Sequence, residues 1–260
     1  MTDPRTTALR NGTEIRSGTA RTIARGRAAL RSAPSHDAVQ DDEFLFGEPV
    51  TVFETKDGWS WCQSGIDRYV GYVHDITLGD PVAADHRVTA LSTPMLSGPD
   101  IKRASRDMLP FNARVKVLSL SNGYAAIKNG GYVFAGHLAP LEQTAPDWVA
   151  TAERFVGTPY VWGGKTHAGM DCSGLVQTAL AGSGIAAPRD TDMQERDLGR
   201  DCLASLRQRG DIVFWPGHVG IMLDAERLLH ANSFHMQVEI EPLAEVLARV
   251  GQKVTAIKRL

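Results

Sequence analysis

The sequence predicts an α+β domain at the C-terminal end, preceded by two small all-β modules. Two observations carry this prediction. Between residues 44 and 141 a weak internal repeat of short alternating strands and tight turns occurs twice. From residue 145 onward the pattern changes to helical spacing, and a run of short strands follows. Helices first and antiparallel strands after them is the order of an α+β domain.

The internal repeat defines the two all-β modules. Its copies align at an offset of 65 over the first hairpin and at an offset of 63 over the last strand. The matched segments are Phe46–Phe53 with Phe111–Leu118, Asp57-Gly58 with Asn122-Gly123, and Tyr69–Leu78 with Tyr132–Leu141. We expect an N-terminal arm (1–32), a first module (33–85), a second module (86–144) and the C-terminal domain (145–260). The arginine-rich stretch Arg16–Arg31 is expected to form a solvated helix or a mobile arm.

The C-terminal domain begins with two expected helices. Trp148, Ala152, Phe155 and Val156 share one face of the first helix. The second is expected from Cys172 to about Ala181, ending at Gly182 or Gly184, which tolerate the positive φ of a helix stop. The elements expected after it are strands at Asp211–Trp215, His218–Leu223, Leu228–Ala231 and Val238–Ile240, a helix at Leu243–Val250, and a strand at Val254–Lys258.

Composition and charge limit the classes of function. The 260 residues carry a formal net charge of −2 with 43% hydrophobic and 22% charged residues, so no overall basic field favours nucleic acid or an anionic membrane. No apolar run reaches the ~18 residues that span a bilayer, and Met1–Arg5 lacks the apolar core of a secretory signal. Three cysteines without paired spacing fit free thiols in a reducing compartment. We therefore expect a cytoplasmic protein without nucleic-acid or membrane partners; its oligomeric state stays open.

Cys172 is the expected nucleophile, because it stands where a helix begins. Amide groups and the helix dipole at that position are expected to lower the thiol pKa. Two downstream strands each carry a histidine, His218 and His230, twelve residues apart. His218 is the expected base and His230 the residue that orients it, with Asn232 as an alternative third member.

Six segments, in this order, resemble the NlpC-type cell-wall cysteine peptidases, a papain-like family. They are Tyr160-Val161-Trp162-Gly163-Gly164, Asp171-Cys172-Ser173-Gly174, Pro188-Arg189-Asp190-Thr191, Gly210–Trp215, His218–Ile221 and Leu229-His230-Ala231. The all-β modules are similar to the bacterial SH3-like domains that often precede such peptidases. The resemblance implies a papain-like catalytic domain behind two SH3-like barrels.

The resemblance also implies a function and further site residues. Similar enzymes cut the γ-D-glutamyl–diamino acid bond of peptidoglycan stem peptides with a free N-terminal L-alanine, and a cytoplasmic member suggests cell-wall recycling. Tyr160 would join the Cys172 amide in stabilising the oxyanion, unless it only packs beside Trp162. Asp171 is the candidate for binding the substrate ammonium, with hydroxyls from Ser173 and Thr191. From the first module we expect Tyr72 and Glu48 to cap the site; Tyr69 and Glu43 are their alternatives.

Three other functions remain open on the sequence. An amidase or acyltransferase could use the same thioester chemistry with another acceptor. A zinc hydrolase could use Cys172, His218 and His230 as ligands, and a non-catalytic protein could bind the cell wall through its β-modules. We expect no cofactor and no metal, since the remaining histidines share no ligand-like spacing and the glycine pairs lack a phosphate-loop context.

Overall fold

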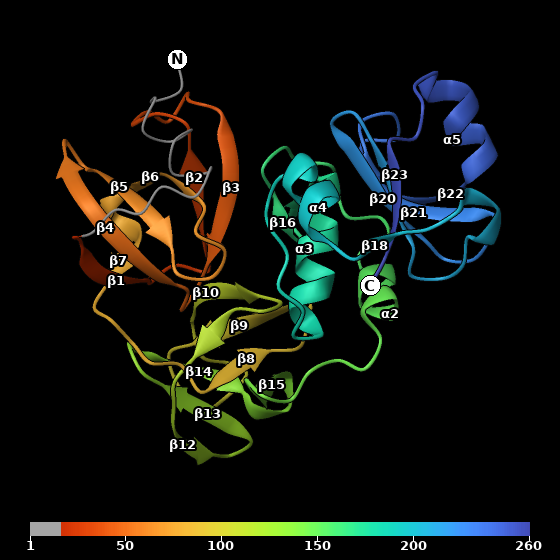
Figure 1. The fold of residues 1–260 in the computed structure, drawn as a ribbon. Helices are drawn as coiled ribbons and strands as arrows, with labels where there is room; N and C mark the ends of the chain where they lie inside the picture. The colour runs from red at the N-terminus through yellow and green to blue at the C-terminus, as the bar shows by residue number, and fades with distance from the viewer. Residues whose placement is uncertain (1–16) are drawn as a thin grey trace. The chain divides into compact units, whose positions relative to one another are not determined.

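The computed structural model describes residues 17–260, which divide after Gln143 into two compact units. Among the described residues, the first unit consists of strands and two short 3₁₀ helices, and the second contains the four α-helices and a six-stranded sheet (Figure 1). In this part of the chain no helix is both long enough and apolar enough to cross a membrane.

The first β-module is an antiparallel seven-stranded sheet in the order β3-β2-β6-β5-β4-β1-β7. Its strands are β1 (Thr19–Ile23), β2 (Arg27–Arg31), β3 (Gln40–Leu45), β4 (Pro49–Lys56), β5 (Trp59–Ser64), β6 (Val70–His74) and β7 (Leu78–Gly79), with the 3₁₀ helix η1 (Asp75–Thr77) before β7. Buried side chains from six of these segments, among them Leu30, Phe44 and Val73, form one core cluster.

The expectation of a solvated helix or mobile arm at Arg16–Arg31 is wrong where the structure describes it. Residues 19–23 and 27–31 form β1 and β2, which pair with strands of the first module, so this sheet begins well before residue 33. In β2, Ala28 and Leu30 are buried between the less buried Arg27 and Arg31, the alternation of a half-buried strand. The arginines lie toward solvent and conceal this pattern. Residues 1–16 of the expected arm lie outside the described residues.

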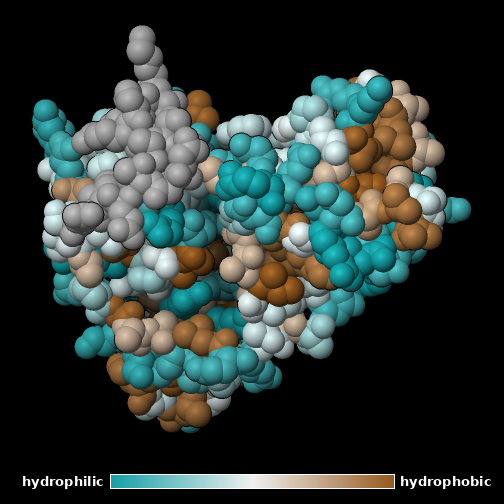
Figure 2. All heavy atoms as spheres, viewed as in Figure 1, coloured by the Kyte–Doolittle hydropathy of each residue, from teal (hydrophilic) through white to brown (hydrophobic). Residues whose placement is uncertain are grey.

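The second β-module contains a five-stranded and a three-stranded sheet, in the orders β10-β9-β14-β13-β12 and β11-β8-β15. The strands are β8 (His86–Val88), β9 (Ser92–Leu96), β10 (Ser105–Pro110), β11 (Arg114–Val115), β12 (Val117–Ser121), β13 (Tyr124–Ile127), β14 (Gly131–Phe134) and β15 (Leu138–Pro140), with the 3₁₀ helix η2 (Ala135–His137). Phe46 of the first module belongs to this module's core cluster. Strands β12 and β14 carry the exposed apolar side chains Leu118, Leu120 and Phe134. Apolar residues are visible on the surface of this module in Figure 2.

The internal repeat holds in its first half and shifts in its second. Asp57-Gly58 and Asn122-Gly123 both have positive φ angles and connect adjacent antiparallel strands, which confirms the offset of 65. However, η1 begins at Asp75 and η2 at Ala135, an offset of 60, so Tyr72 corresponds to Tyr132. The expected offset of 63 is wrong. A tyrosine-valine pair occurs twice within residues 69–73, and the sequence alone favoured the first one.

The C-terminal unit packs helices against an antiparallel sheet in the order β18-β23-β19-β20-β21-β22. Its α-helices are α2 (Trp148–Glu153), α3 (Cys172–Gly182), α4 (Thr191–Asp197) and α5 (Leu243–Val250), with the 3₁₀ helix η3 (Ala204–Leu206). Its strands are β16 (Lys165–Thr166), β17 (Gly169–Met170), β18 (Arg200–Asp201), β19 (Ile212–Trp215), β20 (His218–Met222), β21 (Arg227–Asn232), β22 (Gln237–Pro242) and β23 (Ala256–Arg259). Helix α3 packs on α2 and against β20 and β21, which brings the start of α3 to the two strands that carry His218 and His230.

Candidate active site

Cys172 is the first residue of α3, as the sequence predicts, and it is 6% exposed. Asp171 is the N-cap residue: its backbone is extended and its Oδ1 accepts the Gly174 N–H at 2.7 Å. As the first residue of α3, Cys172 has an N–H without an acceptor within the helix, since no helical carbonyl lies four residues before it. This amide is available to stabilise negative charge beside the sulfur.

A glycine turn supports the start of α3. Gly163 adopts a positive φ of 73° and donates its N–H to Asp171 Oδ2 at 2.8 Å, while Gly164 accepts the Asp171 N–H at 3.1 Å. A Cβ on Gly174 would lie 2.3 Å from the Gly164 carbonyl oxygen. These glycines therefore allow the turn and the helix to approach closely at the floor of the site.

Arg189 holds Asp171 and Ser173 in place at the start of α3, a role that was not predicted from the sequence. Its side chain is 1% exposed and donates to Asp171 through two nitrogens, at 2.6 Å to Oδ2 and 3.0 Å to Oδ1. It also donates to Ser173 Oγ at 2.8 Å. The sequence signal for Arg189 was the Pro188-Arg189-Asp190-Thr191 segment, in which we predicted a role only for Thr191. A buried arginine needs an acidic partner, and Asp171 is that partner.

The structure gives Asp171 and Ser173 supporting contacts within the protein. Asp171 accepts from five donors, whereas a carboxylate offers about four lone-pair sites. Ser173 Oγ lies between Asp171 and Arg189. Thr191, half-buried at the start of α4, has its Oγ1 3.9 Å from Cys172 Sγ. Of the three substrate contacts predicted in this unit, Thr191 is the one that lies against the sulfur. A substrate ammonium that reached Asp171 would have to bind carboxylate oxygens that already accept hydrogen bonds from the protein.

His218 opens β20 immediately after a two-residue turn. Trp215 of β19 pairs with His218 across Pro216-Gly217, and Gly217 has a positive φ of 73°. This turn fixes the histidine at the end of a hairpin. A Cβ on Gly220 would lie 2.9 Å from Leu228 side-chain atoms. The missing side chain of Gly220 therefore serves the packing of β20 on β21.

His218 and His230 are directly hydrogen-bonded. His218 Nε2 lies 2.8 Å from His230 Nδ1, and the Val219 N–H hydrogen-bonds the Cys172 sulfur. His230 is buried, with 1% of its surface exposed. Asn232, the alternative third member, has its Nδ2 3.1 Å from the opposite nitrogen of His230, Nε2. The hydrogen bonds therefore order His218, His230 and Asn232, and the Val219 N–H brings the strand that carries His218 to the Cys172 sulfur.

The pKa values describe a neutral pair in the substrate-free protein. Burial, followed by the charge of Asp171, raises the pKa of the Cys172 thiol to about 11, and the hydrogen bonds from Val219 and Thr191 only partly oppose this. Burial and then His230 lower the pKa of His218 to about 3. The expected lowering of the thiol pKa at the helix start is therefore wrong here, because desolvation outweighs the helix dipole.

Tyr160 is held beside the sulfur by main-chain contacts. It forms a β-bridge to Met170, and its N–H donates to the Met236 carbonyl at 2.8 Å. Burial, and then the charges of Cys172 and Asp171, raise the pKa of the Tyr160 phenol, so the hydroxyl stays a proton donor. Trp162 is 61% exposed, which argues against the alternative that Tyr160 only packs beside Trp162 in a shared core.

The residues of the first module that we expect to cap the active site are Tyr72 and Glu48, with Tyr69 and Glu43 as alternatives, and all four lie in the described part of the N-terminal unit. Tyr72 is half-buried beside Trp61 and Val70, whereas the alternative Tyr69 is buried in the module core. Glu48 is buried at the β3–β4 turn, and the alternative Glu43 is paired with Arg27 at 2.8 Å. Their function as caps of the active site stays a prediction.

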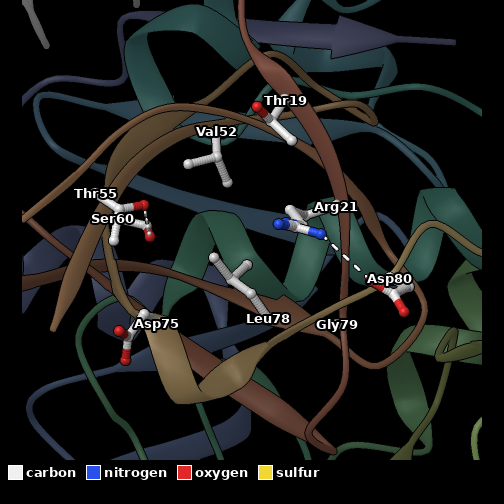
Figure 3. A pocket seen from close by; sticks show the side chains of 9 residues that line it. All are labelled: Thr19, Arg21, Val52, Thr55, Ser60, Asp75, Leu78, Gly79 and Asp80. Atoms are coloured by element: carbon white, nitrogen blue, oxygen red, sulfur yellow. Dashed lines mark hydrogen bonds and ion pairs between the residues drawn. The ribbon is translucent and has the colours of Figure 1, made fainter.

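A hollow of about 410 Å³ opens in the same module (Figure 3). It is lined by residues of β1, β4, β5 and the η1–β7 segment, and an Arg21–Asp80 ion pair of 3.3 Å lies at its edge. None of the residues expected from the first module lines it.

The zinc alternative lacks a converging set of ligands. Across residues 17–260, no three histidine, cysteine, aspartate or glutamate side chains come together in an arrangement that could hold a metal ion. His218 and His230 instead direct one ring nitrogen each at the other.

Comparison with protein families finds two matches. Residues 157–254 match the NlpC/P60 family, and residues 30–78 match the bacterial dipeptidyl-peptidase SH3 domain. The first match contains Cys172, His218 and His230, and the second lies in the first β-module.

Two curated relatives match this chain over most of their own length. Dipeptidyl-peptidase 6 of Lysinibacillus sphaericus is 28% identical over 244 residues, which is 84% of this chain and 89% of the relative. Gamma-D-glutamyl-L-lysine dipeptidyl-peptidase of Bacillus subtilis is 26% identical, covering 86% and 82%. Among solved structures, an NlpC/P60 family protein from Bacillus cereus superposes with a TM-score of 0.78 at 21% identity, over 93% of this chain and 99% of the other. That structure establishes the shared fold.

Proposed function

The chain carries an NlpC/P60 cysteine peptidase domain behind a bacterial dipeptidyl-peptidase SH3 domain, and we propose that it hydrolyses the γ-D-glutamyl–diamino acid bond of short peptidoglycan stem peptides. The proposed substrates have a free N-terminal L-alanine, and the product is L-alanyl-D-glutamate. The observation that carries the proposal is the hydrogen-bonded His218–His230 pair beside the Cys172 sulfur. Relatives named gamma-D-glutamyl-L-lysine dipeptidyl-peptidase supply the substrate class.

The reaction begins with a proton transfer from the Cys172 thiol to His218. The resulting thiolate attacks the γ-carbonyl carbon of D-glutamate, and the carbonyl oxygen becomes an oxyanion. The Cys172 N–H and the Tyr160 hydroxyl donate hydrogen bonds to it. His218 then gives its proton to the departing amine of the diamino acid, which leaves a thioester on Cys172. Water, deprotonated by His218, hydrolyses the thioester and restores the thiol.

His230 keeps His218 in place during these transfers. It is buried, and its Nδ1 is 2.8 Å from His218 Nε2, so the imidazole plane is fixed before substrate binds. Because burial holds the pKa of His218 at about 3, its imidazolium is a strong acid toward the departing amine. The same burial raises the free energy of the His218 imidazolium, so the proton stays on the Cys172 thiol until substrate binds.

Selectivity for a free N-terminus needs negative charge and hydroxyl groups near the ammonium. Asp171 supplies a carboxylate beside Cys172, and Thr191 supplies a hydroxyl 3.9 Å from the sulfur. In this proposal, Ser173 supports Asp171, and Tyr72 and Glu48 of the first module close the substrate's amino end. An acetylated or longer peptide would then be excluded.

The architecture and cellular role complete the proposal. We take the second β-module as another SH3-like domain, since its turns and its strand–3₁₀–strand ending repeat those of the first module. A peptidase limited to small peptides with free amines suits the recycling of cell-wall fragments in the cytoplasm. Cys62, Cys172 and Cys202 are free thiols, which is compatible with a reducing compartment. Cell fractionation tests this location.

The experiment that tests the substrate is mass spectrometry of the products from L-Ala-γ-D-Glu-diaminopimelate and L-Ala-γ-D-Glu-L-Lys, each with a free and an acetylated N-terminus. We expect L-Ala-D-Glu from the free peptides alone. Equal cleavage of the acetylated peptides would contradict the closed amine pocket. Cleavage of none of the four would favour an amidase, an acyltransferase or a non-catalytic wall-binding protein.

A further inference from the structure

His230 is bonded on both ring nitrogens. Its Nδ1 lies 2.8 Å from His218 Nε2, and its Nε2 lies 2.8 Å from Glu241 Oε1 on the neighbouring strand β22. Both His230 and Glu241 are buried, with 1% and 5% of their surfaces exposed. The catalytic pair thus continues into a carboxylate that none of the sequence motifs includes.

Glu241 is held as a carboxylate by Arg249 of α5. The guanidinium donates to Glu241 Oε2 at 2.7 Å and to Oε1 at 2.8 Å, and it stacks over the Phe234 ring at 4.2 Å. His235 Nε2 lies 3.1 Å from Oε2 on the partly exposed side. Burial raises the pKa of Glu241, but hydrogen bonds from Arg249, His230 and His235 outweigh it and lower the pKa to about 2. Glu241 is therefore an acceptor only.

An acceptor at Nε2 determines the tautomer of His230. A carboxylate oxygen 2.8 Å away requires a proton on Nε2, so a neutral His230 has a bare Nδ1. That nitrogen must accept from His218, which places the His218 proton on Nε2. His218 Nδ1 is then bare and available to take the proton of the Cys172 thiol.

Asn232 favours the opposite tautomer. Its Oδ1 accepts the His235 N–H at 2.8 Å, so the amide nitrogen is the group 3.1 Å from His230 Nε2. An amide donor prefers a bare Nε2. The contact with Glu241 is shorter and involves a charge, and charge-assisted hydrogen bonds are roughly twice as strong as neutral ones. Without the carboxylate, the amide would invert the tautomers of both histidines.

We propose that Glu241, anchored by Arg249, is the positioning residue that sets the tautomers of His230 and His218 and so leaves a bare His218 nitrogen for Cys172. This inference rests on the proposed function only in taking Cys172 as the nucleophile. It assigns Glu241 a part in the peptidase reaction although Glu241 touches neither the substrate nor the thiol.

The direct test is ¹⁵N NMR of the full-length wild-type protein with labelled histidines, assigned by single histidine substitutions. We expect a pyrrole-type Nε2 and a pyridine-type Nδ1 in both His230 and His218 near neutral pH. Protonation of His230 at Nδ1, or at both nitrogens, would overturn the proposal. Because this measurement needs no substrate, it decides the proposal even if the tripeptides prove not to be substrates.

Glu241→Gln supplies the functional readout, since glutamine keeps the shape and can donate to His230 Nε2. We expect inverted tautomers and a fall in kcat of about 10- to 100-fold with KM changed less than about twofold, a smaller loss than removal of the general base itself. Glu239→Gln is the matched control on the same strand, because Glu239 lies directly opposite His230 but its carboxylate accepts from Gln237 at 2.6 Å and from the Ile240 N–H at 3.3 Å instead of from a histidine. Wild-type tautomers in Glu241→Gln, whatever its kcat, would show that Glu241 is only a structural partner of Arg249.

Discussion

Arg189→Met should strongly destabilise the C-terminal unit. The change removes a guanidinium that is 1% exposed and that donates to Asp171 at 2.6 and 3.0 Å, which leaves an unpaired carboxylate at the start of α3. Breaking a buried ion pair by removing one partner costs about 3–5 kcal/mol. At ~4 °C of Tm per kcal/mol for a unit of this size, the loss is about 12–20 °C.

Calorimetry of the full chain, following the transition of the C-terminal unit, measures this loss. Arg209→Met is the matched control, because Arg209 pairs with Asp147 and Glu153 at the surface, 40% exposed, and such pairs contribute about 0–1 kcal/mol. Adding Asp171→Asn to Arg189→Met should recover much of the stability, since asparagine still caps a helix and leaves no buried charge. Equal Tm values for Arg189→Met and Arg209→Met would refute the reasoning.

Three further predictions concern the residues around the sulfur. The pKa of His218 is held at about 3, below its ordinary 6.5, so on acidification the unfolded chain binds a proton that the folded chain does not. The free energy of unfolding should therefore fall by about 1.6 kcal/mol from pH 6.5 to 5, and denaturation of His218→Asn should lack this part of the pH dependence. Tyr160→Phe should lower kcat about 10²- to 10³-fold with little change in KM if its hydroxyl binds the oxyanion, and unchanged kcat in steady-state assays would remove it from that role. Gly174→Ala should cost about 1–3 kcal/mol in urea denaturation, because its Cβ would meet the Gly164 carbonyl at 2.3 Å; wild-type stability would contradict that close contact.

The catalytic unit was predictable where local patterns determine structure. The short helix predicted near Leu243–Val250 is present, and the helix from Cys172 ends within one residue of its expected end. The His218–His230 contact followed from twelve-residue spacing on adjacent strands. These features depend on periodicity and turn residues, which a single sequence displays.

The features that were missed depend on contacts between distant segments. Arg189 reaches Asp171 from another part of the chain, and Glu241 reaches His230 from the neighbouring strand, so neither role shows in a local pattern. The pKa of Cys172 was predicted in the wrong direction because burial is a property of the folded unit. Likewise, the short strands β1 and β2 are recognisable only through their pairing with later strands.

The central claim is that Cys172 is the nucleophile of a peptidase that releases L-Ala-D-Glu. The most direct test is the rate of that release from L-Ala-γ-D-Glu-diaminopimelate, measured side by side for wild type, Cys172→Ala and Cys202→Ala. Cys202 is the matched control, a free thiol of the same unit that lies outside the site. The account predicts release by wild type and Cys202→Ala and none above background by Cys172→Ala, since no other residue forms the thioester. Release by Cys172→Ala at the wild-type rate would contradict it.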